Sequence, residues 1–269
     1  IDDGSPDETF EVARRYLEPR RGRFRRLILE RAQNRGVSAN SNACIAACQG
    51  EWVHLLGSDD VLYPNKVARI QAAIDAWHCD DLALVHADVD YINEDGGRIE
   101  RPRAKSRPPA GIEHEAYRWL FLQKHFIFNP TLALHRQSFL DAGGFDPALP
   151  LEDLDCWLRL ATQHTFGRVP EVLAAYRKHP GNASRRRLKM LAAQFDTYAS
   201  FIERYPELLS PDEIRENFRD NLRRFWKRMR RKQPWLYPAV LGARLRYRRT
   251  PPDASAYRRF SAILKRSAT

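Results

Sequence analysis

The chain has 269 residues, of which 43% are hydrophobic and 29% are charged, and its formal net charge is +11. This length and hydrophobic content fit one large domain or a domain with an appendage, and they exclude wholesale disorder. The chain contains no run of about 18 apolar residues, so we expect no membrane-spanning helix.

The first residue, Ile1, reads as the end of a strand, so we expect the sequence to be a fragment that lacks its true start. Four cysteines are scattered without a C-x-x-C pair, namely Cys44, Cys48, Cys79 and Cys156. This usage is typical of a reducing compartment rather than of a disulfide framework, and we therefore expect a cytoplasmic protein.

Charge divides the chain into two parts. Residues 1–184 hold 23 Lys and Arg against 26 Asp and Glu, whereas residues 185–269 hold 22 against 8. Such a shift indicates a boundary near Ser184. We expect one domain over residues 1–184 and a basic extension over residues 185–269.

Strand-like and helix-like segments alternate along residues 1–184. Besides the strand that ends at Ile1, the expected strands are Phe24–Leu29, Glu51–Leu56, Leu82–Ile92 and Thr131–Leu134. The expected helices run to about Tyr16 and over Gly36–Cys48, Pro64–Trp77, Glu113–Leu122 and Glu152–Thr162, with a proline-containing loop at Arg101–Gly111. This alternation predicts an α/β fold with a mostly parallel sheet and helices on both faces.

The extension has helical periodicity. Ser210, Pro211 and Glu213 form a strong helix start, with a capping serine, a proline in the first turn and a glutamate three residues after the cap. An apolar stripe with helical spacing follows, and it comprises Ile214, Phe218, Leu222, Phe225 and Met229. The other faces of this helix carry lysine and arginine, so the extension is predicted to be helical and basic.

Three acidic clusters stand where an α/β sheet presents ligands. The first is Asp2-Asp3-Gly4-Ser5. Its carboxylates can accept hydrogen bonds from a nucleobase or a ribose, Gly4 gives the backbone freedom, and Ser5 can cap the next helix. An ordinary turn with a capping serine is the alternative.

The second cluster, Gly57-Ser58-Asp59-Asp60, directly follows the strand Glu51–Leu56. Adjacent carboxylates repel each other, so both stay ionised only near a cation or solvent. Hard oxygen ligands of this kind suit Mg²⁺ or Mn²⁺ held jointly with a diphosphate, which makes Asp59 and Asp60 candidate metal ligands. A solvated turn before a helix is the alternative.

The third cluster, Glu152-Asp153-Leu154-Asp155, opens an amphipathic helix. The helix dipole stabilises acids at this place, which gives a structural explanation. A carboxylate at a helix start can also be directed into a cleft as a general base. Both explanations remain open on the residues alone.

Further motifs accompany the clusters in a specific order. The first cluster is followed by Asn34-x-Gly36-Val37-Ser38-x-x-x-Asn42 and by Gly50-Glu51-Trp52-Val53-x-x-Leu56-x-Ser58-Asp59-Asp60. Later come Gly143-Gly144-Phe145-Asp146, then Glu152-Asp153-x-Asp155-x-Trp157-x-Arg159-Leu160, and then Tyr176-Arg177-x-His179. Each motif alone is weak, but their order over residues 1–184 resembles that of the family 2 glycosyltransferases.

The resemblance implies a GT-A fold over residues 1–184, without the first strand and helix of that fold. It also implies an inverting transfer of a sugar from a nucleoside-diphosphate sugar. Asp153 would be the catalytic base, and Asp59 the metal-binding aspartate. The nucleotide-binding residues implied are Asp2, Asp3, Ser5, Asn34 and Asp59.

Some positions beside these motifs have two explanations. Arg177 and His179 follow a strand-like segment and can reach a diphosphate, arginine as a fixed fork and histidine as a donor or metal ligand. Glu152 is a further candidate at the acceptor or diphosphate, and a surface loop is the alternative for Arg177 and His179. Gly57 stands where the family has the first acid of its D-x-D motif, so we expect cation binding to rest on Asp59 and Asp60.

Two functions from different classes follow. The first is an enzyme that moves a sugar from a UDP-, GDP- or dTDP-sugar to a glycan or lipid-linked acceptor, in the synthesis of a surface polysaccharide or lipopolysaccharide. The second is a non-catalytic, glycosyltransferase-like nucleotide-binding or scaffold protein, for which Gly57 is the indication. A nucleotidyltransferase also uses paired acids and a metal, but it commonly has a glycine-rich basic loop, and we recognise none here.

The basic extension has three explanations. An amphipathic helix with Phe225, Trp226 and many arginines fits docking on the anionic inner face of a membrane, where the enzyme would be peripheral. A helix that packs on the first domain and exposes a basic face is the alternative. Nucleic-acid binding requires a recognition element beyond charge, and we expect no nucleic-acid partner.

Overall fold

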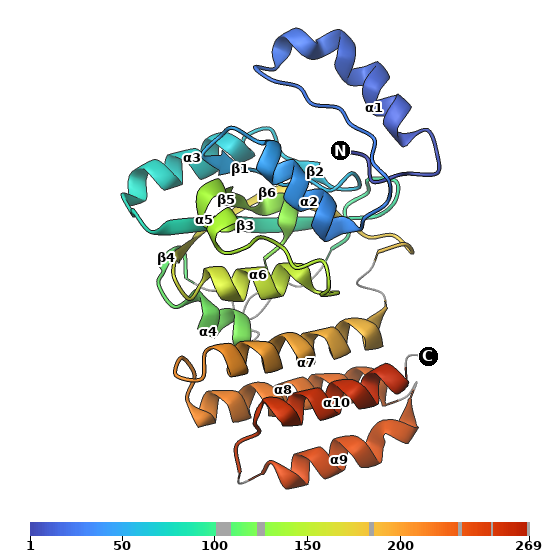
Figure 1. The fold of residues 1–269 in the computed structure, drawn as a ribbon, viewed down its shortest axis with the longest axis vertical. Helices are drawn as coiled ribbons and strands as arrows, with labels where there is room; N and C mark the ends of the chain where they lie inside the picture. Colours follow the sequence, from blue (N-terminus) through green and yellow to red (C-terminus); the bar gives the residue numbers. More distant parts are fainter. Residues whose placement is uncertain (101–108, 123–126, 183–185, 231–232, 249, 268–269) are drawn as a thin grey trace.

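The computed structural model describes residues 1–100, 109–122, 127–182, 186–230, 233–248 and 250–267. Most of the expected loop Arg101–Gly111 lies outside these residues, as does the expected boundary at Ser184. Figure 1 shows a sheet with helices on both faces and, beyond one of these helical layers, a stack of long helices from the last part of the chain.

Six strands form one mixed sheet. They are β1 (Trp52–Val53), β2 (Val61–Leu62), β3 (Leu82–Ile92), β4 (Gly111–Glu113), β5 (Ala133–His135) and β6 (Thr165–Arg177). Their order is β1-β5-β3-β6-β2, and β4 also pairs with β6. The long strands β3 and β6 are parallel, and the other ladders among these strands are antiparallel.

The α/β class is confirmed, but two details of the expectation are wrong. The sheet is not mostly parallel, because four short strands join β3 and β6 or one another antiparallel, and a hydrophobic pattern does not encode strand direction. The segment Phe24–Leu29 forms no strand. Leu27, Ile28 and Leu29 line a cleft instead of pairing. The chain after them forms an isolated bridge with the N-terminal turn, between Asp2 and Arg31, rather than a ladder.

Helices surround the sheet and make up the extension. In residues 1–184 they are α1 (Thr9–Leu17), η1 (Glu18–Arg23), α2 (Val37–Ala47), α3 (Lys66–Trp77), α4 (Ala116–Phe121), η2 (Asn129–Thr131), α5 (Arg136–Asp141) and α6 (Glu152–Leu160). The extension contains α7 (Arg187–Arg204), α8 (Pro211–Met229), η4 (Pro234–Leu236), α9 (Tyr237–Arg246) and α10 (Ala254–Arg266). The predicted start of α8 is confirmed, because the Ser210 hydroxyl accepts from the Glu213 amide while the Glu213 carboxylate accepts from the Ser210 amide.

One hydrophobic core continues from the sheet into the helical extension. Leu84 of β3, Trp157 of α6, Phe195 of α7 and Phe225 of α8 belong to it, and all four are buried. Phe218, Leu222 and Phe225 of the apolar stripe predicted on α8 therefore face the interior. Because Phe225 is 0% exposed, it is not available to a membrane, which corrects the expectation for this face of α8. In the described part of the chain, no helix is both long and apolar enough to cross a membrane.

Lys66 is a buried ionisable residue in the first turn of α3. Its side chain is 0% exposed, and its ammonium group donates to the carbonyl of Leu132 at 2.7 Å and lies 2.6 Å from Nδ1 of His54. Burial lowers the pKa of Lys66 to about 7. Burial and the charge of Lys66 lower the pKa of His54 to about 4. The pair ties α3 to the segment that leads from β1 to Asp59.

We expect the free energy of unfolding to rise with pH between pH 7 and pH 9.5, by up to about 1.4 kcal/mol per pH unit from this residue. In this window the unfolded chain binds a proton at Lys66, whose ordinary pKa is 10.5, and the folded chain does not. Lys66→Met should remove this slope, as measured by urea unfolding across the pH range. Lys189→Met, at an exposed lysine, is the control and should keep the slope of the wild-type protein. If the free energy of unfolding rises equally steeply with pH in wild type and in Lys66→Met, the lowered pKa is not that of Lys66.

Candidate active site

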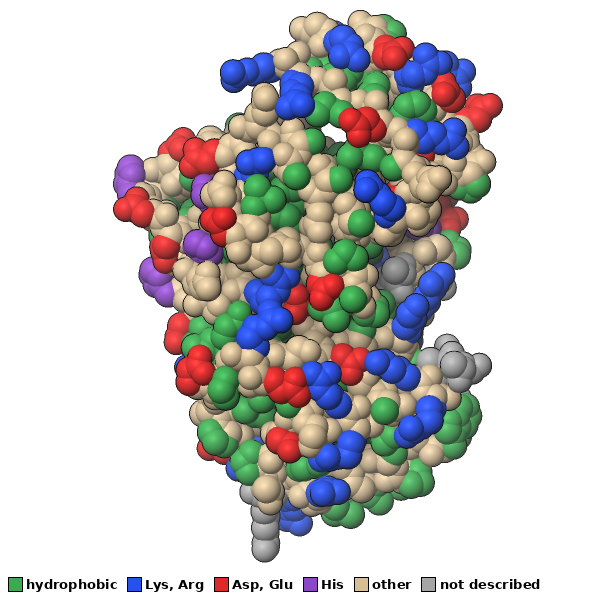
Figure 2. All heavy atoms as spheres, in the orientation of Figure 1, with side chains coloured by type: hydrophobic (Ala, Val, Ile, Leu, Met, Phe, Trp, Pro, Cys, Tyr) green, Lys and Arg blue, Asp and Glu red, His purple; other side chains and the backbone are tan. Residues whose placement is uncertain are grey.

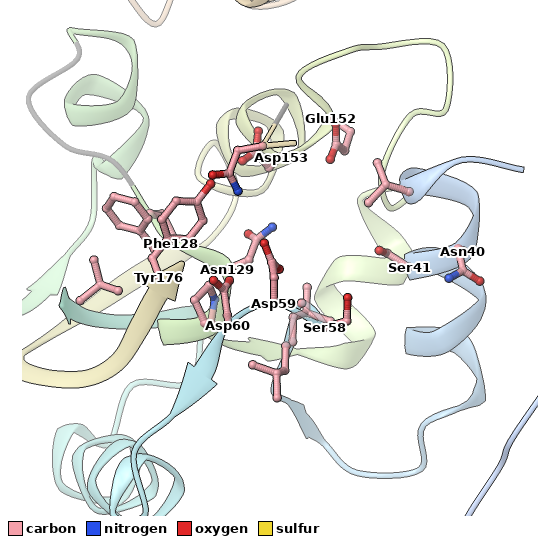
Figure 3. Close-up of a pocket in the computed structure, with 18 of the residues that line it drawn as sticks. Asn40, Ser41, Ser58, Asp59, Asp60, Phe128, Asn129, Glu152, Asp153 and Tyr176 are labelled. Carbon is pink, nitrogen blue, oxygen red and sulfur yellow. The ribbon is translucent and has the colours of Figure 1, made fainter. Parts of the chain in front are cut away.

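A cleft of about 2540 Å³ lies between α2, the ends of β1, β3 and β6, and the start of α6. Ligand pockets usually measure about 300–1000 Å³, so this cleft has room for more than one small ligand. Among the predicted site residues, those that line it are Asp2, Asp3, Ser5, Asp59, Asp60, Glu152, Asp153 and His179. Figure 3 shows Asp59 on one side of the cavity and Asp153 and Glu152 on the other.

Asp59 forms one wall of the cleft together with His179. The turn that carries Asp59 is closed by the Asp60 amide, which donates to the Gly57 carbonyl at 3.3 Å. The Asp59 carboxylate lies 3.0 Å from Nε2 of His179. A Cβ atom at residue 57 would lie 2.9 Å from Oδ1 of Asp59, so Gly57 leaves space for this carboxylate to lie close to the turn.

Arg177 holds this turn in place. Its guanidinium donates to the carbonyls of Asp59, Asn93 and Glu94 at 2.7–2.9 Å, and its amide donates to the Asp60 carboxylate at 2.9 Å. Arg177 is not among the residues that line the cleft, and its contacts within the protein position the turn, while its expected contact with a diphosphate stays a prediction. Burial raises the pKa of Asp60, whose side chain is bound to the end of β6 rather than to His179.

Glu152 and Asp153 form the opposite wall at the first turn of α6. Asp153 accepts a hydrogen bond from the Leu154 amide at 2.7 Å, and burial raises its pKa. Burial, together with the charge of Asp153, raises the pKa of Glu152 to about 7. Asp155, one turn inward, binds Nε of Arg159 at 2.7 Å and is structural. The acidic cluster therefore divides into two carboxyl groups at the cleft and one ion-paired group in the core.

The carboxylates of the first acidic cluster accept hydrogen bonds within the protein, which the sequence did not predict. The Asp3 carboxylate accepts from the amides of Arg35 and Gly36, both at 2.8 Å, and so ties the N-terminal turn to the start of α2. Hydrogen bonds from Ser5 lower the pKa of Asp2. Both aspartates still line the cleft.

One detail expected near this cluster is wrong, and the nucleotide contact expected of Asn34 stays a prediction. Ser5 does not cap a helix, because α1 begins at Thr9 and the Thr9 amide donates to Asp7. Asn34 is exposed and does not line the cleft. Its amide nitrogen would lie 3.0 Å from a Cβ atom at residue 4, so the backbone of Asn34 packs closely against Gly4.

Sequence reasoning missed an aromatic group in the cleft. Tyr91, Phe128 and Tyr176 are in ring contact there, and Nζ of Lys178 lies 4.2 Å from the centre of the Tyr176 ring. Tyr176 belongs to a recognised motif, whereas Tyr91 and Phe128 carried no local signal. Asn42 was recognised as part of a motif but given no role, and its amide group exchanges two hydrogen bonds with the Phe145 backbone at 2.8 and 2.9 Å.

Comparison with protein families matches residues 1–142 to the family described as glycosyl transferase family 2. The succinoglycan biosynthesis protein ExoO of Rhizobium meliloti is 36% identical over 220 residues, covering 76% of this chain and 59% of that protein. An uncharacterized glycosyltransferase of Haemophilus influenzae is 26% identical over 157 residues, covering 58% of this chain and 55% of that protein. The chain thus spans little more than half the length of either relative.

Two solved structures resemble the fold. S. aureus TarS 1–349 in complex with UDP-GlcNAc has a TM-score of 0.63 at 15% identity, over 99% of this chain and 81% of that chain. The mannosyltransferase PcManGT from Pyrobaculum calidifontis, in complex with GDP-Man and Mn²⁺, has a TM-score of 0.53 at 17% identity, over 99% of this chain and 75% of that chain. At these identities the likeness shows the fold alone, which is the GT-A fold expected from the sequence.

We expect Glu152→Gln to stabilise the protein at pH 8, because the folded state no longer holds a carboxylate in a partly buried place. The folded-state pKa of about 7 exceeds the ordinary 4.5, so the stabilising contribution of this group is present below pH 4.5 and is lost as pH rises through 7. With a discount for partial exposure, the Tm should rise by about 2–6 °C at pH 8 and change little at pH 4.5.

Thermal unfolding at both pH values measures this effect. The matched control is Glu94→Gln, at an exposed position, which should leave the Tm unchanged. A Glu152→Gln variant that is no more stable than wild type at pH 8 would show that the carboxylate is well solvated.

Proposed function

Because the chain belongs to glycosyl transferase family 2, we propose that it transfers a sugar from a nucleoside-diphosphate sugar to a hydroxyl group of an acceptor. One observation supports this most: Asp59 and the Glu152–Asp153 pair face one cleft from opposite sides, and His179 also lines it, 3.0 Å from Asp59. A transferase of this class needs a place for the diphosphate and, across the reacting carbon, a base for the acceptor.

Asp59 and His179 suit a divalent cation that binds with the diphosphate. They offer a carboxylate oxygen and an imidazole nitrogen 3.0 Å apart. Among the residues described, no group of three or more His, Cys, Asp or Glu side chains is placed to hold a metal by itself. Mg²⁺ is usually held by one or two protein ligands together with substrate phosphates and water, which fits this pair. When bound, the cation would neutralise charge on the departing diphosphate.

Asp153 is the proposed general base of an inverting transfer. The acceptor oxygen forms a bond to the anomeric carbon and gives its proton to the Asp153 carboxylate, while the bond from that carbon to the diphosphate breaks. The raised pKa of Asp153 makes it a stronger base than an ordinary aspartate. Glu152, beside it, offers a second carboxyl group that would orient an acceptor hydroxyl by hydrogen bonding.

The donor and acceptor are proposed by class. Asp2 and Asp3 line the cleft near the start of α2, where they can accept hydrogen bonds from a nucleobase or ribose of a UDP-, GDP- or dTDP-sugar. A glycan or lipid-linked acceptor in the synthesis of a surface polysaccharide is proposed from the likeness to ExoO, which is named for succinoglycan biosynthesis.

A non-catalytic nucleotide-binding protein is the second candidate, and Gly57 is the observation that favours it. Without an acid at residue 57, the turn offers one carboxylate fewer to a cation or ribose. This candidate predicts metal-dependent nucleotide binding without any turnover, whereas the enzyme releases nucleoside diphosphate.

We expect Asp153→Asn to lower turnover by about 10²- to 10⁴-fold, because the amide cannot take the acceptor proton. Release of nucleoside diphosphate from UDP-, GDP- and dTDP-sugars, with Mn²⁺ and Mg²⁺, measures this loss. Binding of UDP, GDP or dTDP should persist in the variant. Glu152→Gln is the matched comparison and should lose less activity. Near-normal turnover of Asp153→Asn would refute the assignment of the base.

We expect Asp59→Asn to weaken nucleotide binding in Mn²⁺ by at least about tenfold and to leave binding in chelator unchanged, because an amide is a poorer metal ligand. Asp60→Asn keeps an oxygen that can accept from the Arg177 amide, so it should retain the Mn²⁺ effect. Calorimetric titration of UDP, GDP and dTDP with and without Mn²⁺ tests both. An equal loss in Asp60→Asn would place the cation between the two aspartates.

A further inference from the structure

The outer face of α9 is apolar although its inner face is already packed. Leu236 and Val240 turn inward and are 4% and 1% exposed. On the outer side, Leu241 and Leu245 are one helical turn apart and are 38% and 62% exposed, and Trp235, just before the helix, is 63% exposed. We call Trp235, Tyr237, Leu241 and Leu245 the α9 patch.

Along the sequence, the charge on either side of the α9 patch has a single sign. Between Asp220 and Asp253 the sequence has no acid and eleven Lys and Arg residues. Arg244, Arg246 and Arg248, which interleave with the patch, are exposed. The segment has no histidine, so this positive charge does not depend on pH near neutrality.

The patch lies at the end of the molecule that is most distant from α1. Figure 1 shows α9 as the outermost element of the helical stack, with α8 and α10 between it and the rest of the fold. Figure 2, in the same orientation, shows hydrophobic and basic side chains side by side at this lower end. The cleft is lined instead by residues of α1, α2, α6 and α7, among other elements, and by Arg224 of α8.

We propose that α9 docks on an anionic lipid surface, with the α9 patch entering the headgroup region and Arg244, Arg246 and Arg248 binding lipid phosphates. Tryptophan, tyrosine and leucine on one side of a basic helix are the composition that binds at a bilayer interface. No helix in the described residues is long and apolar enough to span the bilayer. The inference rests on the tail alone and holds whether or not the cleft transfers a sugar.

Charge complementarity favours lipid over the other occupants. In a symmetric dimer through this face, the segment with eleven Lys and Arg residues in one copy would lie against the same segment in the other copy. Repulsion between these like charges would destabilise the dimer. A nucleic acid would satisfy the arginines and leave the exposed leucines without apolar contact. A second region with exposed apolar and basic residues surrounds α1, but it also contains Glu8, Glu11 and Glu18.

Binding to vesicles of phosphatidylcholine alone, and of phosphatidylcholine with 30 mol% phosphatidylglycerol, tests the proposal by flotation. We expect binding to the anionic vesicles that weakens with added NaCl, and at least about tenfold weaker binding to the neutral ones. Arg244→Gln/Arg246→Gln/Arg248→Gln should lower the affinity on the order of 100-fold, since each arginine near the surface contributes roughly fivefold. Leu241→Ser/Leu245→Ser should lower it at least about tenfold.

Variants at α1 provide the matched controls. Val12→Ser with Tyr16→Ser removes exposed apolar groups of α1, and Arg15→Gln/Arg23→Gln/Arg25→Gln removes the same charge from α1 and the segment that follows it. These should bind vesicles like wild type. All substituted side chains are exposed, so an unchanged Tm and unchanged nucleoside-diphosphate release with a soluble acceptor are expected throughout.

Three outcomes would overturn the proposal. The first is no preference of the wild-type protein for anionic vesicles. The second is that the α1 variants lose binding and the α9 variants retain it. The third is a concentration-dependent dimer, seen by light scattering, that Leu241→Ser/Leu245→Ser abolishes while vesicle binding is absent, which would assign the patch to a second copy.

Discussion

The parallel pairing of β3 with β6 is the constraint on which the site depends. The two strands pair along ten residue pairs, so their carboxyl ends lie side by side although they are about 80 residues apart in sequence. From the end of β6, Arg177 reaches back to the turn at Asp59 and forward to the turn after β3. This places His179 against Asp59, a contact between residues 120 positions apart. A shift of this register would separate the two side chains.

Acidic side chains in this fold have two kinds of neighbour. Away from the cleft, the buried acid Asp155 has a cationic partner in Arg159. At the cleft, Glu152 is set beside another acid. A protein interior tolerates such an arrangement only at a cost in stability, which is why unusual pKa values gather at functional sites. The carboxyl groups at the start of α6 are thus explained better by chemistry than by packing.

The helical extension is both part of the core and a surface of its own. Phe195, Phe218 and Phe225 continue the apolar interior that begins at the sheet, so α7, α8 and α10 cover a face that would otherwise be exposed. The helix α9 packs through one narrow side only. Its opposite side has exposed leucines, in a segment whose charged residues are all Lys and Arg. Packing of the core does not require this composition.

The sequence by itself determined the kinds of residue and their local places: the turn at Asp59, the acids at the start of α6, the capping box at Ser210 and the concentration of charge after residue 184. These depend on spacing, turn chemistry and helix capping, which act over a few residues. Only the tertiary structure decided that Arg177 positions a turn, that Phe225 is internal and that Tyr91, Phe128 and Tyr176 share the cleft. Strand direction and long-range contacts decide such roles, because they set which side chains lose water and which partners they meet.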